Sequence, residues 1–445
     1  MPPETHQQAD LLLTGTVCTL DPQQTVIQQG AVAIGGDTII DIGPAADLLP
    51  RHPGAMRLEE PHGLIMPGLV NSHTHAAMSC FRGLADDLPL MQWLQEYIFP
   101  VEAKLTSEMV YQGTLLSAAE MIRSGTTCFC DMYLFAREVA RATVDCGMRG
   151  FIGEVLYDFP SPNYGDLANG FAYVEEMMAE YRNHPLVTVT VAPHAVYTCS
   201  PELLGKLKEI AHRHHAPYVI HLSESRDEVD GCLARYQTTP VMHLERLGLL
   251  DERVIADHCV VLTDEEIELL AKRGVKVAHC PESNMKLASG VAPVPRLLAA
   301  GVTVGLGTDG SASNNDVDLF REMDTTAKLH KVFALDPTVM SASQTLHLAT
   351  MGGAGLLSAA DRIGSLEKGK KADLIVLDLN QPHLTPLYHL PSHLVYAARG
   401  GDVIHSVING RLVMKNRTLL TIDQPALMER INEIAATVRK ITGMK

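Results

Sequence analysis

The sequence predicts an α/β protein: a (β/α)8 barrel with a small discontinuous β-sandwich domain built from both termini. Eight apolar runs lie between residues 62 and 310 and alternate with helical segments, as the buried parallel strands of βα repeats do. Residues 10–60 and the chain after Ser365 instead show short alternating strands between glycines and prolines, which is typical of antiparallel sheet. Eight strands in about 250 residues match a TIM barrel.

The positions of the eight runs define the expected domain boundaries. They are GLIMPGLVNSH (63–73), GTTCFCDM (125–132), GFIGEVL (150–156), VTVTVAPH (187–194), PYVIHLS (217–223), VIADHCV (254–260), VKVAHCP (275–281) and VTVGLGTDG (302–310). An open doubly wound sheet is the competing arrangement, but no glycine-rich nucleotide fingerprint follows any run. We therefore expect a first β part (1–61), a barrel (62–362) and a second β part with a C-terminal helix (363–445).

Composition excludes several classes of protein. The formal charge of −16, from 36 basic and 52 acidic residues, would repel a phosphate backbone, so we expect no nucleic-acid partner. Residues 1–10 are polar and lack the pattern of a secretory signal, and no segment is apolar for the length of a membrane span. Nine cysteines without a C-x-x-C pair are typical of a reducing compartment, which predicts a cytoplasmic location.

Histidine and aspartate residues recur at the carboxyl ends of the predicted strands. His73 and His75 close the first strand, His221 the fifth and His258 the sixth, while Asp309 closes the eighth. In a barrel these ends meet at one mouth, and residues two apart on a strand face the same side. A single H-x-H pair could be two ordinary polar residues, but the repetition at strand ends indicates a metal site.

Imidazole nitrogens with one carboxylate suit a divalent ion, with Zn²⁺ the default and Fe²⁺ also accepted by such donors. A bound ion would lower the pKa of a water molecule toward about 7. Glu224 follows His221 by three residues in HLSE, close enough to exchange protons with a substrate. A solvated loop carboxylate is the alternative interpretation of Glu224.

At these positions the sequence resembles the amidohydrolase superfamily, in its mononuclear branch of adenosine-type, guanine, 5-methylthioadenosine/S-adenosylhomocysteine and triazine hydrolases. The resemblance covers nearly the whole chain. Its carriers are PGLVNSHTH (67–75), HLSE (221–224), DHCV (257–260), HCPESNMKL (279–287), GTDGSASNN (307–315) and KKADLIVLD (370–378).

The resemblance implies one metal ion per subunit. Binuclear members carry a carboxylated lysine at the end of strand 4, whereas here that strand ends in APHAVYTCS, with His194 at the position concerned. The implied metal ligands are His73, His75, His221 and Asp309, and His258 is expected to be hydrogen-bonded to the bound water or to the substrate.

The resemblance is nearest to the methylthioadenosine/S-adenosylhomocysteine deaminases and implies further substrate-binding residues. Glu102 matches a glutamate that holds the ribose hydroxyls, Arg149 an arginine ahead of strand 3, and His194 a histidine after strand 4. Taken alone, Glu102 could be a solvated carboxylate and Arg149 a charge at a helix end. We find no match between Asp158 and His184 for an arginine that grips the homocysteine carboxylate, which favours methylthioadenosine over S-adenosylhomocysteine as substrate. S-adenosylhomocysteine and adenosine stay open as alternative substrates.

The predicted reaction is hydrolytic deamination at C6 of the adenine ring. Glu224 gives a proton to ring N1 and also binds the substrate, Asp309 takes a proton from the attacking water, and His258 stabilises the new oxygen. Three alternatives stay open: a guanine or 8-oxoguanine deaminase, a triazine chlorohydrolase, and an inactive barrel kept as a scaffold. By resemblance alone, we expect a homodimer.

Overall fold

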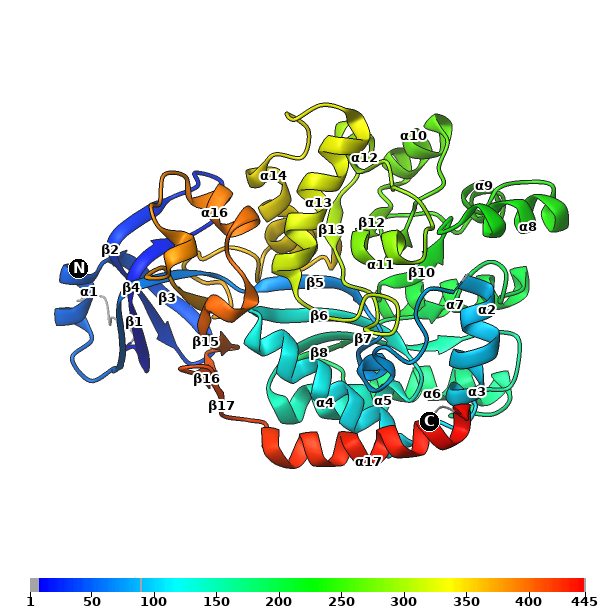
Figure 1. Cartoon of the computed structure of the whole chain (residues 1–445), viewed down its shortest axis with the longest axis horizontal. Coiled ribbons are helices and arrows are strands. Elements are labelled where there is room, and N and C mark those ends of the chain that lie inside the picture. The colour runs from blue at the N-terminus through cyan, green and yellow to red at the C-terminus, as the bar shows by residue number, and fades with distance from the viewer. Residues whose placement is uncertain (1–7, 89, 444–445) are drawn as a thin grey trace.

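The computed structural model describes residues 8–88 and 90–443, so most of the polar start used in the targeting prediction lies outside the described residues. The described chain forms a barrel and a β domain, placed side by side (Figure 1). None of its helices is both long and apolar enough to cross a bilayer. The predicted α/β barrel with a β domain from both termini is confirmed.

Parallel strands form the barrel in two hydrogen-bonded groups, and each predicted run supplies its part. They are β5 (Leu69–Thr74), β6 (Thr126–Tyr133), β7 (Arg149–Leu156), β8 (Val187–Val189), β9 (Ala192–Pro193), β10 (Tyr218–Leu222), β11 (Val254–His258), β12 (Lys276–His279) and β13 (Val304–Leu306). Parallel bridges such as Ala195 to His221 join the groups on one side. On the other side, the Asp309 N–H donates to the His73 carbonyl at 2.9 Å, which closes the mouth between β13 and β5.

Helices follow the strands and cover the barrel. The principal ones are α4 (Ser107–Arg123), α5 (Ala136–Cys146), α6 (Leu167–Glu180), α7 (Pro201–His214), α8 (Arg226–Tyr236), α9 (Pro240–Arg246), α10 (Asp264–Arg273), α11 (Pro281–Lys286), α12 (Val294–Ala299), α13 (Leu319–Ala334) and α14 (Ala342–His347). Hydroxyl side chains start several of them, since Thr106, Ser200, Ser225 and Thr263 each accept a backbone N–H of the first turn. Such caps fix the residue at which each helix begins.

The β domain joins the two ends of the chain in one sheet. Its strands are β1 (Leu11–Cys18), β2 (Val26–Gly35), β3 (Thr38–Pro44), β4 (Met56–Pro67), β14 (Leu374–Asp378), β15 (Val403–Ile408), β16 (Arg411–Lys415) and β17 (Thr418–Leu419). Their order is β17-β16-β15-β14-β4-β1-β2-β3, so β4 and β14 pair across more than 300 residues of sequence. A separate apolar cluster that includes Leu13, Ile65 and Val376 packs within this domain.

The boundary expected after residue 61 falls inside β4 and is wrong. Leu64 pairs with Leu377 and Pro67 with Leu374, so this part of the run belongs to the β domain. The chain passes into the barrel at Gly68, where a Cβ atom would collide with the side chain of Thr127. The two strands look like one apolar run in the sequence because both are buried.

The last helix, α17 (Gln424–Thr442), lies along the barrel and away from the β domain (Figure 1). Asp423 caps its N-terminus, and Leu427, Ile434 and Val438 form its buried stripe, as the helical spacing predicts. It packs against α4, against the 3₁₀ turn η1 (Ala76–Phe81) and against α3 (Phe99–Glu102). The C-terminal helix therefore contacts the segment that carries Glu102.

Arg149 links the barrel to the β domain at the end opposite the mouth. It is the first residue of β7, and its guanidinium donates to both carboxylate oxygens of Asp373, at 2.6 and 3.1 Å. It also donates to the Pro185 carbonyl and to Asn409 Oδ1. All of its contacts are thus structural, and the interpretation of Arg149 as a substrate-binding residue is corrected.

Replacing Arg149 by methionine should lower stability without changing catalysis. The substitution leaves the buried Asp373 carboxylate without its ion pair, which costs about 3–5 kcal/mol of the free energy of unfolding. Denaturant unfolding measures this loss, and KM and kcat of the folded variant should match the wild type. A raised KM with unchanged stability would return Arg149 to substrate binding.

Candidate active site

The predicted metal ligands meet at the carboxyl ends of the barrel strands. His73 and His75 come from β5, His221 from β10, and Asp309 follows β13. His258, the last residue of β11, lies beside them, with its ring centroid 5.3 Å from that of His73. Of the five side chains, only His75 is more than slightly exposed. Strand ends far apart in sequence therefore deliver one compact cluster.

Backbone carbonyls fix the orientation of two of these rings. The Nδ1–H of His75 donates to the Met132 carbonyl at 2.6 Å, and that of His221 to the His194 carbonyl at 2.9 Å. Their Nε2 atoms then carry lone pairs, and these two atoms face each other at 3.3 Å. Burial, together with the neighbouring histidines, lowers the pKa of His75 to about 4 and that of His221 well below its usual value. Two neutral lone pairs at this distance repel unless a cation lies between them.

Asp309 supplies a fixed carboxylate to the same point. Its Oδ1 lies 3.3 Å from His75 Nε2 and 3.5 Å from His73 Nε2, and it accepts the Gly310 N–H at 2.7 Å. Its Oδ2 accepts the hydroxyls of Ser283, at 2.6 Å, and Ser313, at 3.1 Å. Asp309 has a φ of 61°, a left-handed conformation that costs energy outside glycine and is typical of functional sites.

Two carboxylates favour positive charge at His73. Its Nδ1 faces Asp257 Oδ2 at 3.1 Å, and both side chains are fully buried. Burial lowers the pKa of His73, but Asp257 and Asp309 outweigh it and raise the pKa to about 10. Among the described residues, neither ring nitrogen of His73 has a well-aligned hydrogen-bond partner. A divalent ion at Nε2 would take the place of the proton there, and Asp257 would then accept the Nδ1–H from behind, as carboxylates do behind metal-bound histidines.

The donor set fits one divalent ion. Ligand atoms of His73, His75 and His221 lie within 4.8 Å of one another, as do those of His73, His258 and Asp309. Three imidazole nitrogens and one carboxylate oxygen form a site that Zn²⁺ or a similar ion binds. His258 is turned differently, because its Nδ1 contacts the Asn284 amide nitrogen at 3.0 Å and its Nε2 lies 4.0 Å from Glu224.

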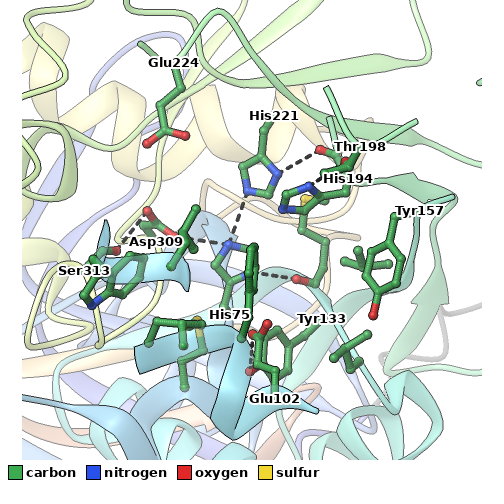
Figure 2. A pocket seen from close by; sticks show the side chains of 18 of the residues that line it. His75, Glu102, Tyr133, Tyr157, His194, Thr198, His221, Glu224, Asp309 and Ser313 are labelled. Carbon is green, nitrogen blue, oxygen red and sulfur yellow. Dashed lines mark hydrogen bonds and ion pairs between the residues drawn. The ribbon is translucent and has the colours of Figure 1, made fainter. Parts of the chain in front are cut away.

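A cavity opens above this cluster, called here the mouth cavity (Figure 2). It is lined by His75, Met78, Trp93, Leu94, Ile98, Phe99, Glu102, Met132, Tyr133, Leu134, Val155, Tyr157, Phe159, His194, Tyr197, Thr198, His221, Glu224, His258, Leu287, Asp309 and Ser313. Glu224 lies on one side of the histidines, and Glu102 lies on the other with Tyr133 (Figure 2). The two acidic residues predicted from the sequence thus face one space from opposite sides.

Burial changes the protonation of the cavity's acidic residues. It raises the pKa of Glu224 to about 8, with a further contribution from the charge of Asp309, so this carboxyl is protonated at neutral pH. Burial likewise raises the pKa of Glu102 to about 7, although the Tyr133 hydroxyl donates to its Oε1 at 2.8 Å. A proton donor beside a metal cluster suits general acid catalysis.

His194 also lines the mouth cavity. Its Nδ1 contacts Thr198 Oγ1 at 2.8 Å, and burial, with the neighbouring His75, lowers its pKa to about 3. The ring is therefore neutral and able to hydrogen-bond a substrate. The cavity brings together every predicted site residue except His73, which lies beneath it, and Arg149.

Several residues of the site have no distinctive signal in the sequence. Tyr133 lies one residue beyond the second predicted run, and Asp257 and Asn284 look like ordinary polar positions. Asp257 could have been noticed because it precedes His258 at a strand end, where its side chain must point to the other face. Nothing in one sequence marks Tyr133 as the partner of Glu102.

The chain matches two protein-family models. The model described as "Amidohydrolase family" matches residues 64–413, and a second one, an imidazolonepropionase-like composite domain of bacteria, matches residues 30–55. The chain therefore belongs to the amidohydrolase family. The first match spans the barrel with part of the β domain and the second lies within the β domain.

Curated relatives place the chain more narrowly within that family. It is 56% identical to the 5-methylthioadenosine/S-adenosylhomocysteine deaminase of Syntrophobacter fumaroxidans, over 97% of this chain and 99% of the relative. It is 50% identical to deaminase 1 of the same name from Syntrophus aciditrophicus, over 97% of each chain. A solved zinc-bound adenosine deaminase from Xanthomonas campestris superposes with a TM-score of 0.96 at 41% identity, covering 98% of this chain and 99% of that one.

Substituting a ligand should remove the metal. The purified protein should carry about one equivalent of a divalent ion per chain, and His221→Ala should lose more than about 90% of it because three donors bind far more weakly than four. Elemental analysis by mass spectrometry measures both. His212→Ala, which changes an exposed histidine on α7, is the matched control and should keep the ion. Full metal content in His221→Ala would contradict the ligand assignment.

Proposed function

We propose that the protein hydrolytically deaminates an adenine nucleoside, with 5′-methylthioadenosine as the preferred substrate. The observation that carries the proposal is the placement of Glu224, a buried carboxyl that faces the metal-ligand cluster across the mouth cavity. The names of the curated relatives support the reaction, and the zinc in the Xanthomonas campestris structure supports Zn²⁺ as the ion.

A divalent ion at the four ligands would acidify a bound water and so supply a nucleophile at neutral pH. The chain's own residues would move the protons. Glu224 gives a proton from its carboxyl to ring N1, which withdraws electrons from C6 as the water oxygen adds there. Asp309 accepts the proton of the attacking water. Asp309 then gives this proton to the 6-amino group, the C6–N bond breaks as ammonia leaves, and the proton of the added hydroxyl goes to Glu224, which leaves a 6-oxo purine.

His258 is suited to stabilise the oxygen that is added at C6. The amide of Asn284 occupies its Nδ1, so the ring proton lies on Nε2, on the side of the cavity and Glu224. Burial lowers the pKa of His258 to about 4, which keeps the ring neutral. A neutral N–H donor already in place stabilises developing negative charge without reorganisation.

Glu102 supplies the binding group that a nucleoside needs and a free base does not. It lies across the histidine cluster from Glu224, and the Tyr133 hydroxyl holds its Oε1 (Figure 2). Its second oxygen is available to accept from the vicinal hydroxyls of a ribose. A guanine deaminase or a triazine chlorohydrolase acts on a ring without ribose, which would give the Glu102 carboxyl nothing to bind.

The lining of the mouth cavity favours a neutral, apolar 5′ substituent. Besides its polar groups, it is lined by apolar and aromatic side chains, which include Trp93, Phe99 and Leu134, and Tyr157 stacks on Phe159 with centroids 3.8 Å apart. No lysine or arginine of the described chain lines it. A methylthio group gains from burial here, whereas the amino-acid tail of S-adenosylhomocysteine would leave a carboxylate without a cationic partner.

The expected homodimer and cytoplasmic location stay predictions.

Glu224→Gln should abolish deamination but not metal binding. The amide cannot give a proton to N1, so kcat should fall on the order of 10²-fold or more. Loss of the aminopurine absorption band measures turnover, and elemental analysis should show the wild-type metal content. Turnover near the wild-type rate would overturn both the role of Glu224 and the reaction proposed.

Glu102→Ala should weaken nucleosides selectively. Losing a charge-assisted hydrogen bond to ribose costs about 1.5–3 kcal/mol, or about 10–10²-fold in kcat/KM for methylthioadenosine. A panel of methylthioadenosine, S-adenosylhomocysteine, adenosine, adenine and guanine tests this, with methylthioadenosine expected to be the best substrate. Activity on free bases but not on nucleosides would favour a base deaminase. No activity with a full complement of metal would favour the scaffold alternative.

A further inference from the structure

The turn that presents Glu224 is conformationally unusual. Strand β10 ends at Leu222, and the next residue, Ser223, has a φ of 52°, in the left-handed region. Residues with a Cβ enter this region at a cost and need support from their surroundings. The turn brings Glu224 to the mouth cavity three residues after the ligand His221. Its shape therefore decides where the acidic group points.

Hydrogen bonds hold this turn on both sides. The Ser223 carbonyl accepts the N–H groups of Val260 at 3.0 Å and Val261 at 2.9 Å, from the chain that follows β11. The Ser223 and Glu224 N–H groups both donate to one side chain, that of Glu228, at 3.1 Å to Oε1 and 2.7 Å to Oε2. One carboxylate thus binds the two peptide groups that precede the Glu224 side chain.

Glu228 does not form the usual capping-box hydrogen bond at the start of α8. It is the third residue of α8, whose N-cap is Ser225, and a glutamate there usually returns to the backbone N–H of the cap itself. Glu266 does this at the start of α10, where it accepts the Thr263 N–H at 2.8 Å. Glu228 instead reaches past Ser225 to the two residues before it.

The side chain of Glu228 is buried, yet it does not line the mouth cavity. Burial raises the pKa of Glu228 to about 8, and the nearby Glu224 raises it further, while the two backbone N–H groups act in the opposite direction. A second acidic group placed this close to a buried acid is electrostatically costly. The hydrogen bonds to the turn are the compensation that the structure provides.

We propose that Glu228 is a positioning residue for the deamination, because it holds the Ser223–Glu224 backbone so that the Glu224 carboxyl points at the substrate ring. This inference rests on the proposed function and adds a residue that does not touch the substrate. Misplacing a catalytic group by about 1 Å can cost on the order of 10²-fold in rate. Binding of the nucleoside and the metal depends on other residues and should survive.

The first experiment compares Glu228→Gln with Glu266→Gln. In Glu228→Gln the amide keeps one acceptor and places an NH₂ against the other N–H, so kcat should fall about 10- to 10²-fold while KM and metal content stay within about threefold of wild type. Glu266→Gln alters the same kind of buried cap after the next strand and should leave kcat within about twofold. Thermal unfolding of both variants measures the structural cost common to them.

A double-mutant cycle separates positioning from general structural support. If Glu228 acts through Glu224, then Glu228→Gln should cause no further loss of residual kcat in a Glu224→Gln background. A purely structural role would reduce kcat by the same factor in both backgrounds and would overturn the proposal. So would a Glu228→Gln enzyme with kcat within about twofold of wild type.

A shorter carboxylate keeps the test available if the glutamine variant does not fold. Glu228→Asp retains the carboxyl group but reaches only one of the two N–H groups, so the same cycle with this variant should again show loss only when Glu224 is present. Failure of the proposed function has a different signature: no nucleoside is deaminated by metal-loaded wild type, or Glu224→Gln stays fully active. An inactive Glu224→Gln beside a fully active Glu228→Gln would refute only the positioning role.

Discussion

The site depends on one electrostatic constraint, which is that unprotonated imidazole nitrogens converge on a single point. The carbonyls of Met132 and His194 accept hydrogen bonds from the Nδ1–H groups of His75 and His221, and the two Nε2 atoms, which carry lone pairs, lie 3.3 Å apart. Asp309 adds a carboxylate oxygen at a similar distance. Such an arrangement is unfavourable by itself and becomes favourable around a cation. The ends of the barrel strands hold these ligand atoms close together.

The two ends of the barrel have different tasks. At the mouth, buried polar groups are aimed at a ligand, and left-handed residues such as Ser223 and Asp309 hold their side chains in place. At the opposite end, Arg149 and Asp373 form a buried ion pair that fastens the β domain. This division is common to TIM-barrel proteins, where the carboxyl end carries chemistry and the amino end carries stability.

The sequence was sufficient to place the strands and to bring the predicted metal ligands and Glu224 together at one end of the barrel. Apolar runs that end in His or Asp have both a period and a stop signal, so their place in a barrel follows from elementary geometry. The interpretation of Arg149 as a substrate-binding residue was wrong because it rested on resemblance alone. A residue at the start of a barrel strand lies at the end of the barrel away from the mouth. The boundary at Gly68 could not be seen, since only pairing between Leu64 and Leu377 separates β4 from β5.

Other features depend on contacts that have no local signature. Tyr133 matters because it lies at the end of β6 and meets Glu102 of α3. Glu228 matters because its side chain bends back past its own N-cap. Each is an ordinary residue of its type in the sequence. Partner choice within a buried network is decided by packing, which a single sequence does not disclose.

The route of the chain has a consequence for the order in which the molecule can be completed. β4 leads directly into the first barrel strand, but its neighbour β14 is synthesised only after the whole barrel. The helix α17, which packs on α3 and thus on the segment that ends at Glu102, follows all of these strands in the chain. During translation all the residues of the histidine cluster therefore leave the ribosome before the helix that supports the Glu102 segment is complete.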